Sequence, residues 1–322
     1  MGELRILDLH PEAEDFKKSI LSGLSSRPKA LPSKYLYDER GSELFDLICQ
    51  QPEYYQTRSE VSILEANIDE ICRCFGKSLH LIEYGSGHSR KIRVLIEGLK
   101  EKLHYSPLDI SKEYLIETAE ILHRDYPAMD ITAVCADMLN GQSIINALSD
   151  VAPNQKRVVF FPGSTVGNFE PPTADSIMES TAALVGKGGG FLVGIDLRKD
   201  PAVIEAAYND AAGATRTFEL NYFSRLNREL NANFDVSQWE YRGKYLPDYG
   251  RVQMEAVSLI DQTVRIGEKE ISIQKDEPIH LENSYKFTVE DFSERAARFG
   301  LQLKEHWTDE KQWFGVLYFE VA

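Results

Sequence analysis

The sequence predicts an α/β protein with a mainly parallel sheet in one domain and a second, smaller α+β domain. Two observations lead to this prediction. Between residues 57 and 198, short apolar segments alternate with helical patterns, as expected for parallel strands joined by helices that cover both faces of a sheet. Between residues 199 and 285, a helical stretch is followed by short alternating segments, which is typical of antiparallel strands.

The composition and net charge of the chain exclude several classes of function. The chain has 322 residues, of which 43% are hydrophobic and 27% charged, so it can bury a real core. Its net charge of −15 repels phosphates, and we expect no nucleic-acid partner. No apolar run is long enough to span a membrane, and the acidic start lacks the apolar core of a signal peptide. We therefore expect no membrane association.

The four cysteines do not have the spacing of a redox pair or a zinc knuckle. They are Cys49, Cys72, Cys74 and Cys135. Since disulfides form mainly in oxidising compartments, we expect four reduced thiols in a cytoplasmic protein. We expect no metal site.

The first 58 residues show no regular pattern. Four tyrosines gather near their end, and they indicate either the wall of a pocket or a segment that packs onto a core: Tyr35, Tyr37, Tyr54 and Tyr55. Thr57 and Glu60 have the spacing of a capping box, which predicts that a helix begins there. Apolar residues at helical spacing continue that helix to Phe75.

The remaining elements follow in order along the chain. Five strands of the parallel sheet are expected at residues 79–84, 104–110, 131–137, 157–163 and 189–197. Helical stretches follow residue 200, and an antiparallel meander occupies residues 238–273 with a turn at Gly267. A helix that ends near Gly300 and a strand at residues 313–321 complete the chain.

The most distinctive local motif is the glycine turn Gly85-Ser86-Gly87, which follows a strand and precedes a helix. Glycine lets such a turn fold tightly and lets a nucleotide approach the backbone. The third glycine of the dinucleotide fingerprint is absent, which disfavours a pyrophosphate cofactor and a nicotinamide-dependent oxidoreductase. An ordinary tight turn between strand and helix is the alternative interpretation.

Polar groups follow the next strands at their carboxyl ends. Asp109 ends the second strand, where a carboxylate can bind both ribose hydroxyls of an adenosine. Asp137 and Met138 follow the third strand, where they could contact an adenine edge and face. Gly163 and Asn168 follow the fourth strand, at the edge where ligands bind in open α/β sheets. Each residue taken alone is more often part of a solvated loop.

The chain resembles the L-histidine Nα-methyltransferases of ergothioneine biosynthesis, which make trimethylhistidine (hercynine). The likeness runs nearly end to end, and its most specific phrases are PEYYQTR at residues 52–58 and PGSTVGNF at residues 162–169. The resemblance implies a Rossmann-like S-adenosylmethionine methyltransferase domain at residues 59–198 plus 286–322. It implies a substrate-binding domain at residues 1–58 plus 199–285, with the pocket between the two domains.

The resemblance also implies a site for S-adenosylmethionine, the methyl donor. The matching residues are Gly85, Ser86, Gly87, Lys91, Asp109, Asp137 and Met138. Asp109 would hold the ribose, while Asp137 and Met138 would lie beside the adenine. Met138 stands where the family usually has phenylalanine, and His88 stands where it has a small hydroxyl residue. We interpret His88 as a loop residue and not as a catalytic base.

The acceptor site implied by the resemblance draws on both domains. Tyr37 and Gly163 would lie beside the α-amine, where the reaction takes place. The substrate-binding residues would be Tyr54, Asn168, Tyr208, Met254, Glu282 and Ser284. Asn168 and Tyr208 would bind the carboxylate. Tyr54, Glu282 and Ser284 would bind the imidazole, and Met254 would line the side-chain pocket.

Three questions stay open at this point. Some relatives act on a tryptophan derivative, although Glu282 with Ser284 favours histidine because indole offers only one N–H donor. The chain could methylate another amino acid, or it could bind S-adenosylmethionine without catalysis. We expect a monomer that methylates the small molecule L-histidine three times.

Overall fold

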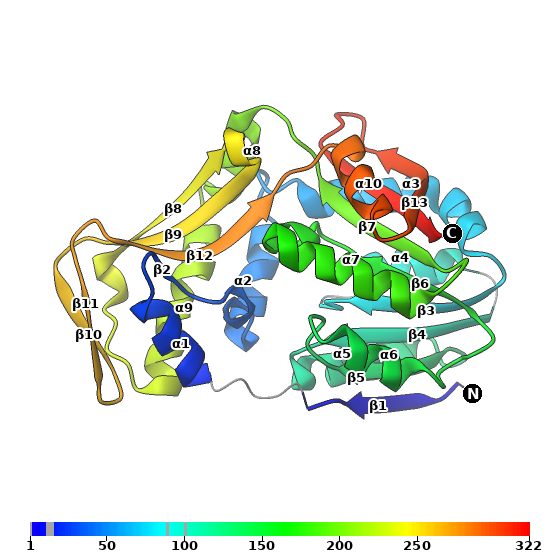
Figure 1. Cartoon of the computed structure of the whole chain (residues 1–322), viewed down its shortest axis with the longest axis horizontal. Coiled ribbons are helices and arrows are strands. Elements are labelled where there is room, and N and C mark those ends of the chain that lie inside the picture. The colour runs from blue at the N-terminus through cyan, green and yellow to red at the C-terminus, as the bar shows by residue number, and fades with distance from the viewer. Residues whose placement is uncertain (1, 11–15, 88–89, 100–101) are drawn as a thin grey trace. The chain divides into compact units, whose positions relative to one another are not determined.

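The computed structural model spans residues 1–322 and describes all of them except residues 1, 11–15, 88–89 and 100–101 (Figure 1). The chain forms two compact units. Unit 1 consists of Met1–Glu12, Gln56–Arg198 and Lys286–Ala322, and unit 2 consists of Ala13–Tyr55 and Lys199–Tyr285. The chain changes unit after Glu12, Tyr55, Arg198 and Tyr285.

Unit 1 is built on an eight-stranded sheet in the order β1-β5-β4-β3-β6-β7-β14-β13. The strands are β1 (Leu4–Asp8), β3 (Ser78–Tyr84), β4 (Lys102–Asp109), β5 (Asp130–Cys135), β6 (Lys156–Phe161), β7 (Gly190–Asp196), β13 (Leu301–Thr308) and β14 (Phe314–Val321). Among the described strands of this sheet, β14 alone runs opposite to the rest, and it pairs antiparallel with β7 and β13. All five expected parallel strands are confirmed, and the chain reverses its direction of travel across the sheet between β3 and β6, where such sheets bind ligands.

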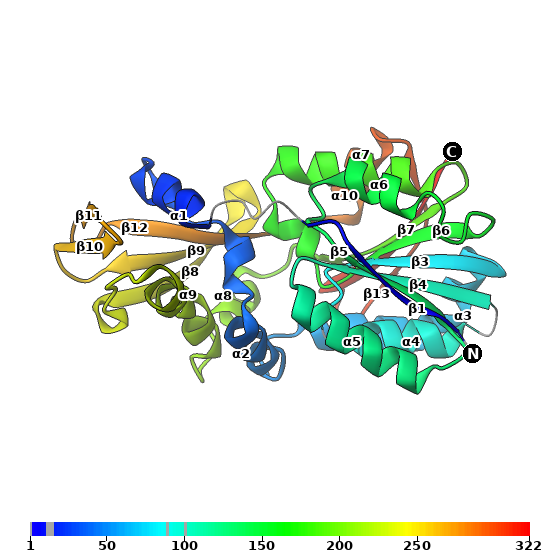
Figure 2. The same cartoon turned by 90° about the horizontal axis from the view of Figure 1, so that it is seen from below.

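Helices cover both faces of this sheet (Figure 2). The first face carries α3 (Gln56–Phe75), α4 (Arg90–Gly98) and α5 (Lys112–Asp125); the second carries α6 (Gly141–Leu148), α7 (Pro171–Val185) and α10 (Val289–Ala297). Each face has its own apolar core. Burial on both faces explains why the strands read as nearly continuous apolar runs.

Two strands of unit 1 were not expected. The strand β1 extends the sheet by pairing in parallel with β5, although residues 1–58 show no regular pattern. The strand β13 has a run of exposed residues from Lys304 to His306 and lies at the opposite edge. Edge strands are often short or charged, which weakens the alternation by which a strand is predicted.

Unit 2 contains a four-stranded sheet in the order β2-β12-β9-β8 and a separate hairpin. Its strands are β2 (Lys29–Ala30), β8 (Trp239–Leu246), β9 (Arg251–Ser258), β12 (Pro278–Tyr285), β10 (Gln262–Ile266) and β11 (Lys269–Ile273). The antiparallel pairing of β8 with β9 is confirmed. The predicted turn at Gly267, which has φ +59°, closes the β10–β11 hairpin, which forms its own sheet.

Helices of unit 2 pack beside the larger sheet. They are α1 (Phe16–Ser25), α2 (Glu39–Cys49), α8 (Pro201–Tyr208) and α9 (Ala214–Leu230), with short 3₁₀ turns η1 (Ser33–Leu36), η3 (Val236–Gln238) and η4 (Pro247–Tyr249). Helix α9 contacts both α2 and β8. The first 58 residues are therefore not irregular, because they hold β1, α1, β2, η1 and α2. No helix in the described ranges is long and apolar enough to cross a membrane.

A fully buried ion pair joins the ends of the two long segments of unit 1. The ammonium of Lys286 lies 2.8 Å from a carboxylate oxygen of Asp196, and both side chains are inaccessible to solvent. The side-chain amide of Gln56 donates to the same oxygen at 3.3 Å. Because each residue lies within a few positions of a unit boundary, the pair fixes the chain where it enters and leaves unit 1.

Candidate functional site

The glycine turn lies directly after β3, at the carboxyl edge of the unit 1 sheet. Gly85 has φ +66°, and a Cβ atom placed on it would meet only the Cε of Met138, 3.9 Å away. The backbone amides of Gly85 and Ser86 donate to the carbonyl of Leu108, at 2.9 and 3.2 Å. The turn is thus fastened to β4 on one side and has bare backbone on the other, as a nucleotide site requires.

Asp109 follows at the end of β4. Its carboxylate accepts a hydrogen bond of 2.9 Å from the backbone amide of Ser111. Burial raises the pKa of Asp109, while backbone hydrogen bonds from Ser111, Ile110 and Gly87 act in the opposite direction. The structure therefore brings Asp109 and the glycine turn together, as the sequence predicts.

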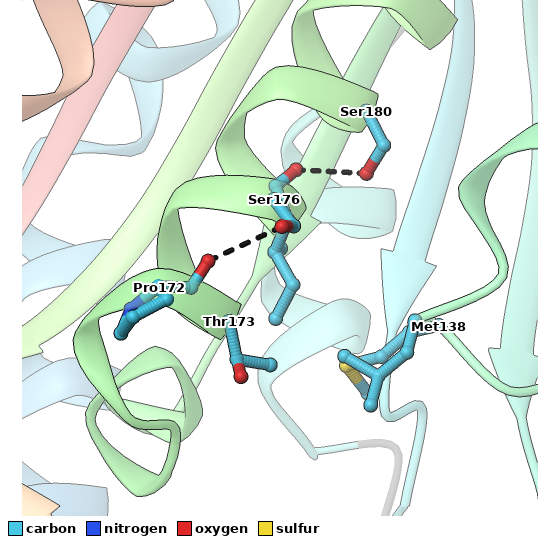
Figure 3. Close-up of a pocket in the computed structure, with 7 residues that line it drawn as sticks. Met138, Pro172, Thr173, Ser176 and Ser180 are labelled. Atoms are coloured by element: carbon cyan, nitrogen blue, oxygen red, sulfur yellow. Dashed lines mark hydrogen bonds between the residues drawn. The ribbon is translucent and has the colours of Figure 1, made fainter.

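Asp137 and Met138 follow β5. A carboxylate oxygen of Asp137 accepts from the backbone amide of Leu139 at 2.9 Å, which closes a tight turn. Met138 and Leu139 line a pocket of ≈ 280 Å³ together with the first half of α7 (Figure 3). The pocket wall on α7 consists of Pro172, Thr173, Ser176, Ile177 and Ser180.

The serine hydroxyls of this pocket are bonded to their own helix. Ser176 donates to the carbonyl of Pro172 at 3.2 Å, and Ser180 donates to the carbonyl of Ile177 at 3.0 Å (Figure 3). Their polarity is thereby largely satisfied within α7. The α7 wall of the pocket, opposite Met138, can therefore contact a flat, mainly apolar group.

Glu60 organises the loop after β6. Its fully buried carboxylate lies 2.6 Å from the ammonium of Lys91, and the backbone amide of Gly163 donates to it at 2.9 and 3.1 Å. The helix predicted from Thr57 to Phe75 is confirmed as α3, but Glu60 does not take the capping-box role, because its carboxylate bonds to Lys91 and Gly163. A Cβ on Gly194 would lie 2.2 Å from Glu60 Oε1, so this carboxylate requires glycine there.

Glu83 is a second buried acid near the glycine turn. Burial raises its pKa to about 8, although the Tyr105 hydroxyl donates to it and the charge of Lys91 opposes the rise. Near neutral pH, much of this carboxyl therefore holds a proton. Glu83 was not among the predicted site residues, although an acid inside an apolar strand was a signal for it.

In unit 2, the predicted side-chain site lies on one face of the four-stranded sheet. Glu282 and Ser284 are two residues apart on β12, and Glu282 pairs with Met254 on β9. Residues directly opposite each other in an antiparallel pair share a face, so these three side chains point the same way. All three are buried.

Aromatic residues surround this face. The hydroxyls of Tyr208 and Ser284 are hydrogen-bonded at 2.7 Å, and the ring of Tyr54 lies 6.4 Å from that of Tyr208. Burial raises the pKa of Tyr37 well above its usual value, and the charges of Glu282 and Glu219 raise it further. The structure thus gathers Tyr37, Tyr54 and Tyr208 with the three sheet residues in unit 2.

Asn168 lies in unit 1, at the end of the 3₁₀ turn η2 (Thr165–Asn168) that follows Gly163. His88 lies outside the described residues. Within the part of the chain that the structure describes, no group of three or more potential ligands is placed to hold a metal ion.

Comparison with known proteins identifies the family. Residues 16–321 match the family described as "Histidine-specific methyltransferase, SAM-dependent". The chain belongs to this family. It is an S-adenosylmethionine-dependent methyltransferase with a Rossmann-like domain, and S-adenosylmethionine is its methyl donor.

Curated relatives match this methyltransferase over most of its length. It is 34% identical to the histidine N-alpha-methyltransferase of Mycolicibacterium smegmatis, over 94% of each chain. The identity to the enzyme of the same name from Mycobacterium tuberculosis is also 34%, over 93% of each chain. The ergothioneine biosynthesis protein 1 of Neurospora crassa is 30% identical over 87% of this chain and 32% of its own length.

The residues of unit 1 fit the methyl donor. A bare glycine backbone, a carboxylate at the end of the next strand and a pocket beside Met138 lie along one edge of the sheet. These features suit a nucleoside with two ribose hydroxyls and a flat base. The resemblance also places Lys91 in this site. Its ammonium forms an ion pair with the carboxylate of Glu60 at 2.6 Å.

Proposed function

We propose that this methyltransferase transfers three methyl groups from S-adenosylmethionine to the α-amine of L-histidine. The product would be Nα,Nα,Nα-trimethylhistidine (hercynine), for ergothioneine biosynthesis. The observation that carries the proposal is the buried face formed by Glu282, Ser284 and Met254 in a histidine-specific family. A carboxylate and a hydroxyl beside an apolar side chain suit a small ring with polar nitrogens.

We assign the methyl donor to the edge of unit 1. Asp109 would bind the ribose hydroxyls, and the turn Gly85-Ser86-Gly87 would allow close approach to the backbone. Asp137 and Met138 would contact the adenine, which the pocket beside Met138 could accept. Bound there, S-adenosylmethionine supplies a methyl group on a positively charged sulfur.

Lys91 and Gly163 would act through their shared partner in this proposal. Because Glu60 binds both the ammonium and the backbone amide, it fixes the loop after β6 relative to α4. Gly163 would then present its backbone beside the reacting amine. Asn168, which follows on the same loop, would bind the substrate carboxylate together with Tyr208.

The acceptor amine must be neutral to attack the methyl group. A free α-amine has a pKa of about 8, so losing its proton near neutral pH costs only about 1 kcal/mol. Tyr37 stays a phenol because its pKa is raised. Its oxygen can therefore accept a hydrogen bond from the amine and orient the lone pair, but it does not act as a phenolate base. Alignment of the two reacting atoms supplies most of the rate enhancement.

The tyrosines also support successive methylation. Each transfer adds bulk to the nitrogen, and the third leaves a fixed positive charge without an N–H donor. Aromatic faces bind quaternary ammonium groups without hydrogen bonds. Tyr37 and Tyr54, with the neighbouring ring of Phe45 at 5.8 and 6.1 Å, provide such faces.

We further propose that the enzyme acts as a cytoplasmic monomer without nucleic-acid or membrane partners. Four cysteines that form no disulfide, Cys49, Cys72, Cys74 and Cys135, support a reducing compartment. The net charge of −15 disfavours binding to phosphate backbones. Sedimentation of the purified chain would contradict the monomer if it gave twice the mass of 36.6 kDa.

Product analysis tests the proposed function. The enzyme is incubated with a labelled methyl donor and either histidine or tryptophan, and products are read by mass spectrometry. The proposal predicts mono-, di- and trimethylated histidine in succession. Methylated tryptophan without methylated histidine would overturn the assigned acceptor, and a final product with one methyl group would overturn trimethylation.

A further inference from the structure

A second buried glutamate lies beside the predicted imidazole site. Glu219 is on α9 and is only 1% exposed. Its Oε2 atom is buried and has no hydrogen-bond partner among the residues that the structure describes. A buried carboxylate oxygen without a hydrogen-bond partner is unfavourable, so it is rarely retained without a use.

The surroundings of Glu219 are acidic and phenolic. Burial raises its pKa well above the usual value, and the neighbouring charge of Glu282 raises it further. Glu219 also interacts electrostatically with Tyr37 and Tyr241, whose pKa values are raised by burial and by both glutamates. Across the described residues, burial and the charge of Glu282 are the influences on the pKa of Glu219, and no cation lowers it.

The sheet register places Tyr241 and Glu282 on the same face of the unit 2 sheet. Tyr241 pairs with Ala256 on β9, two residues from Met254, so its side chain shares the face that carries Glu282. Its hydroxyl donates to the carbonyl of Tyr208 at 3.0 Å. A Cβ on Gly243 would lie 2.6 Å from the Tyr241 hydroxyl, so glycine there makes room for it.

We infer that Glu219 and Glu282 together form a two-carboxyl receptor that binds the acceptor's imidazole ring as its cation. The inference rests on the proposed function and adds a specificity residue to it. An imidazolium has two N–H donors, one for each carboxyl group, and its positive charge suits an acidic surrounding. Neutral imidazole has only one N–H and would leave an acceptor oxygen unpaired.

The proton balance of binding follows from this arrangement. Two adjacent buried carboxyl groups cannot both ionise easily, so the pair in the free enzyme shares a proton. When neutral histidine binds, that proton moves to the lone pair of the ring nitrogen. The ring becomes imidazolium between two carboxylates, and no proton is taken from solvent.

The test uses the full-length enzyme and three variants. Glu219→Gln and Glu282→Gln keep the shape of each side chain but remove its charge. Glu268→Gln, at an exposed position in the β10–β11 turn, is the matched control. Calorimetry measures the affinity for histidine and, separately, for S-adenosylhomocysteine, which binds the donor site.

The inference predicts that Glu219→Gln weakens histidine binding about tenfold or more, as for loss of a charged hydrogen bond. Affinity for S-adenosylhomocysteine should stay unchanged, and Glu268→Gln should bind both ligands like the wild type. Unchanged histidine affinity in Glu219→Gln would overturn the inference. Equal weakening of both ligands would also overturn it, because it would show a general structural role.

A second readout reports the charge of the ring directly. Histidine with ¹⁵N in its ring is bound to the enzyme at a pH above 7.5, where free imidazole is mainly neutral. The wild type should give ¹⁵N shifts of a doubly protonated ring, and Glu219→Gln should give those of a neutral ring. A neutral ring in the wild type would overturn the inference while leaving histidine methylation intact. Failure of the wild type to methylate histidine would overturn the proposed function first.

Discussion

Two buried glutamates, one in each unit, differ in what surrounds them. Glu60 in unit 1 is bonded to the ammonium of Lys91 and to the backbone amide of Gly163. Glu219 in unit 2 has a buried oxygen without a partner in the described ranges and faces another acid, Glu282. Both sit on helices and both are inaccessible to solvent, yet only one has its charge compensated by the protein.

This difference distinguishes a residue that supports the fold, Glu60, from one that would bind a ligand, Glu219. A buried charge with a complete set of partners holds loops in place, and its removal leaves those partners unsatisfied. A buried acid without a cation is a cost to the folded chain, and it becomes favourable when a cationic ligand arrives. The comparison therefore predicts opposite effects on stability for the two residues.

The largest effect is expected for Glu60→Ala. The substitution leaves the Lys91 ammonium and the Gly163 amide without their partner, and we expect the free energy of unfolding to fall by about 3–5 kcal/mol. Urea unfolding measures the change, with the exposed Glu65→Ala on the same helix as control. A loss below about 1 kcal/mol, the usual value for a surface pair, would contradict the supporting role of Glu60.

A pH-dependent effect is expected from Glu83. Its pKa is about 8 in the folded enzyme and near 4.5 when unfolded, so the folded state binds more protons between these values. Stability should therefore fall as pH rises from about 4.5 to 8, by at most about 1.4 kcal/mol per pH unit from this group.

Glu83→Gln removes this contribution while an amide oxygen can still accept from Tyr105. The variant should gain stability relative to the wild type as pH rises, in unfolding curves taken at several pH values. A difference that stays constant with pH would show that the carboxyl is ionised throughout.

An intermediate effect is expected on donor binding. Asp109→Asn should weaken S-adenosylhomocysteine binding by about 1.5–3 kcal/mol, the usual value of hydrogen bonds to a charged group. Histidine affinity should change little, because the side-chain site lies in unit 2. Calorimetry with both ligands checks this, and unchanged donor affinity would remove Asp109 from the ribose site.

The smallest effect on stability is expected for a substitution of Glu219, the residue compared with Glu60. Glu219→Gln should raise the free energy of unfolding of the ligand-free enzyme by about 1 kcal/mol, a common gain when a residue retained for function is removed. The same variant should bind histidine less tightly. A fall in stability of the ligand-free variant would show that Glu219 supports the fold, as Glu60 does.

Sequence patterns predicted most of unit 1 and suggested where the methyl donor would bind. Gly85 and Asp109 follow apolar strands, and carboxyl ends of parallel strands meet at one edge, so their proximity could be foreseen. The edge strands β1 and β13 were missed because short or charged edge strands show only a weak alternation of apolar and polar residues. The spacing of Thr57 and Glu60 predicted a capping box. In the structure, the carboxylate of Glu60 instead bonds to Lys91 and to the backbone amide of Gly163.

The side-chain site was predictable only in part. Glu282 and Ser284 could be placed on one face because a strand alternates, and the family resemblance suggested their role. Glu219 was missed, since a glutamate in a helix normally faces water. Only the packing of α9 shows that it is buried beside Glu282.

The most direct test of the account is methylation of histidine and tryptophan offered together at equal concentration, with products resolved by mass. The account predicts methylated histidine that proceeds to the trimethylated form, with tryptophan unchanged in the wild type. Preferential methylation of tryptophan would contradict it, because the acidic face formed by Glu282 and Glu219 would then not select the acceptor.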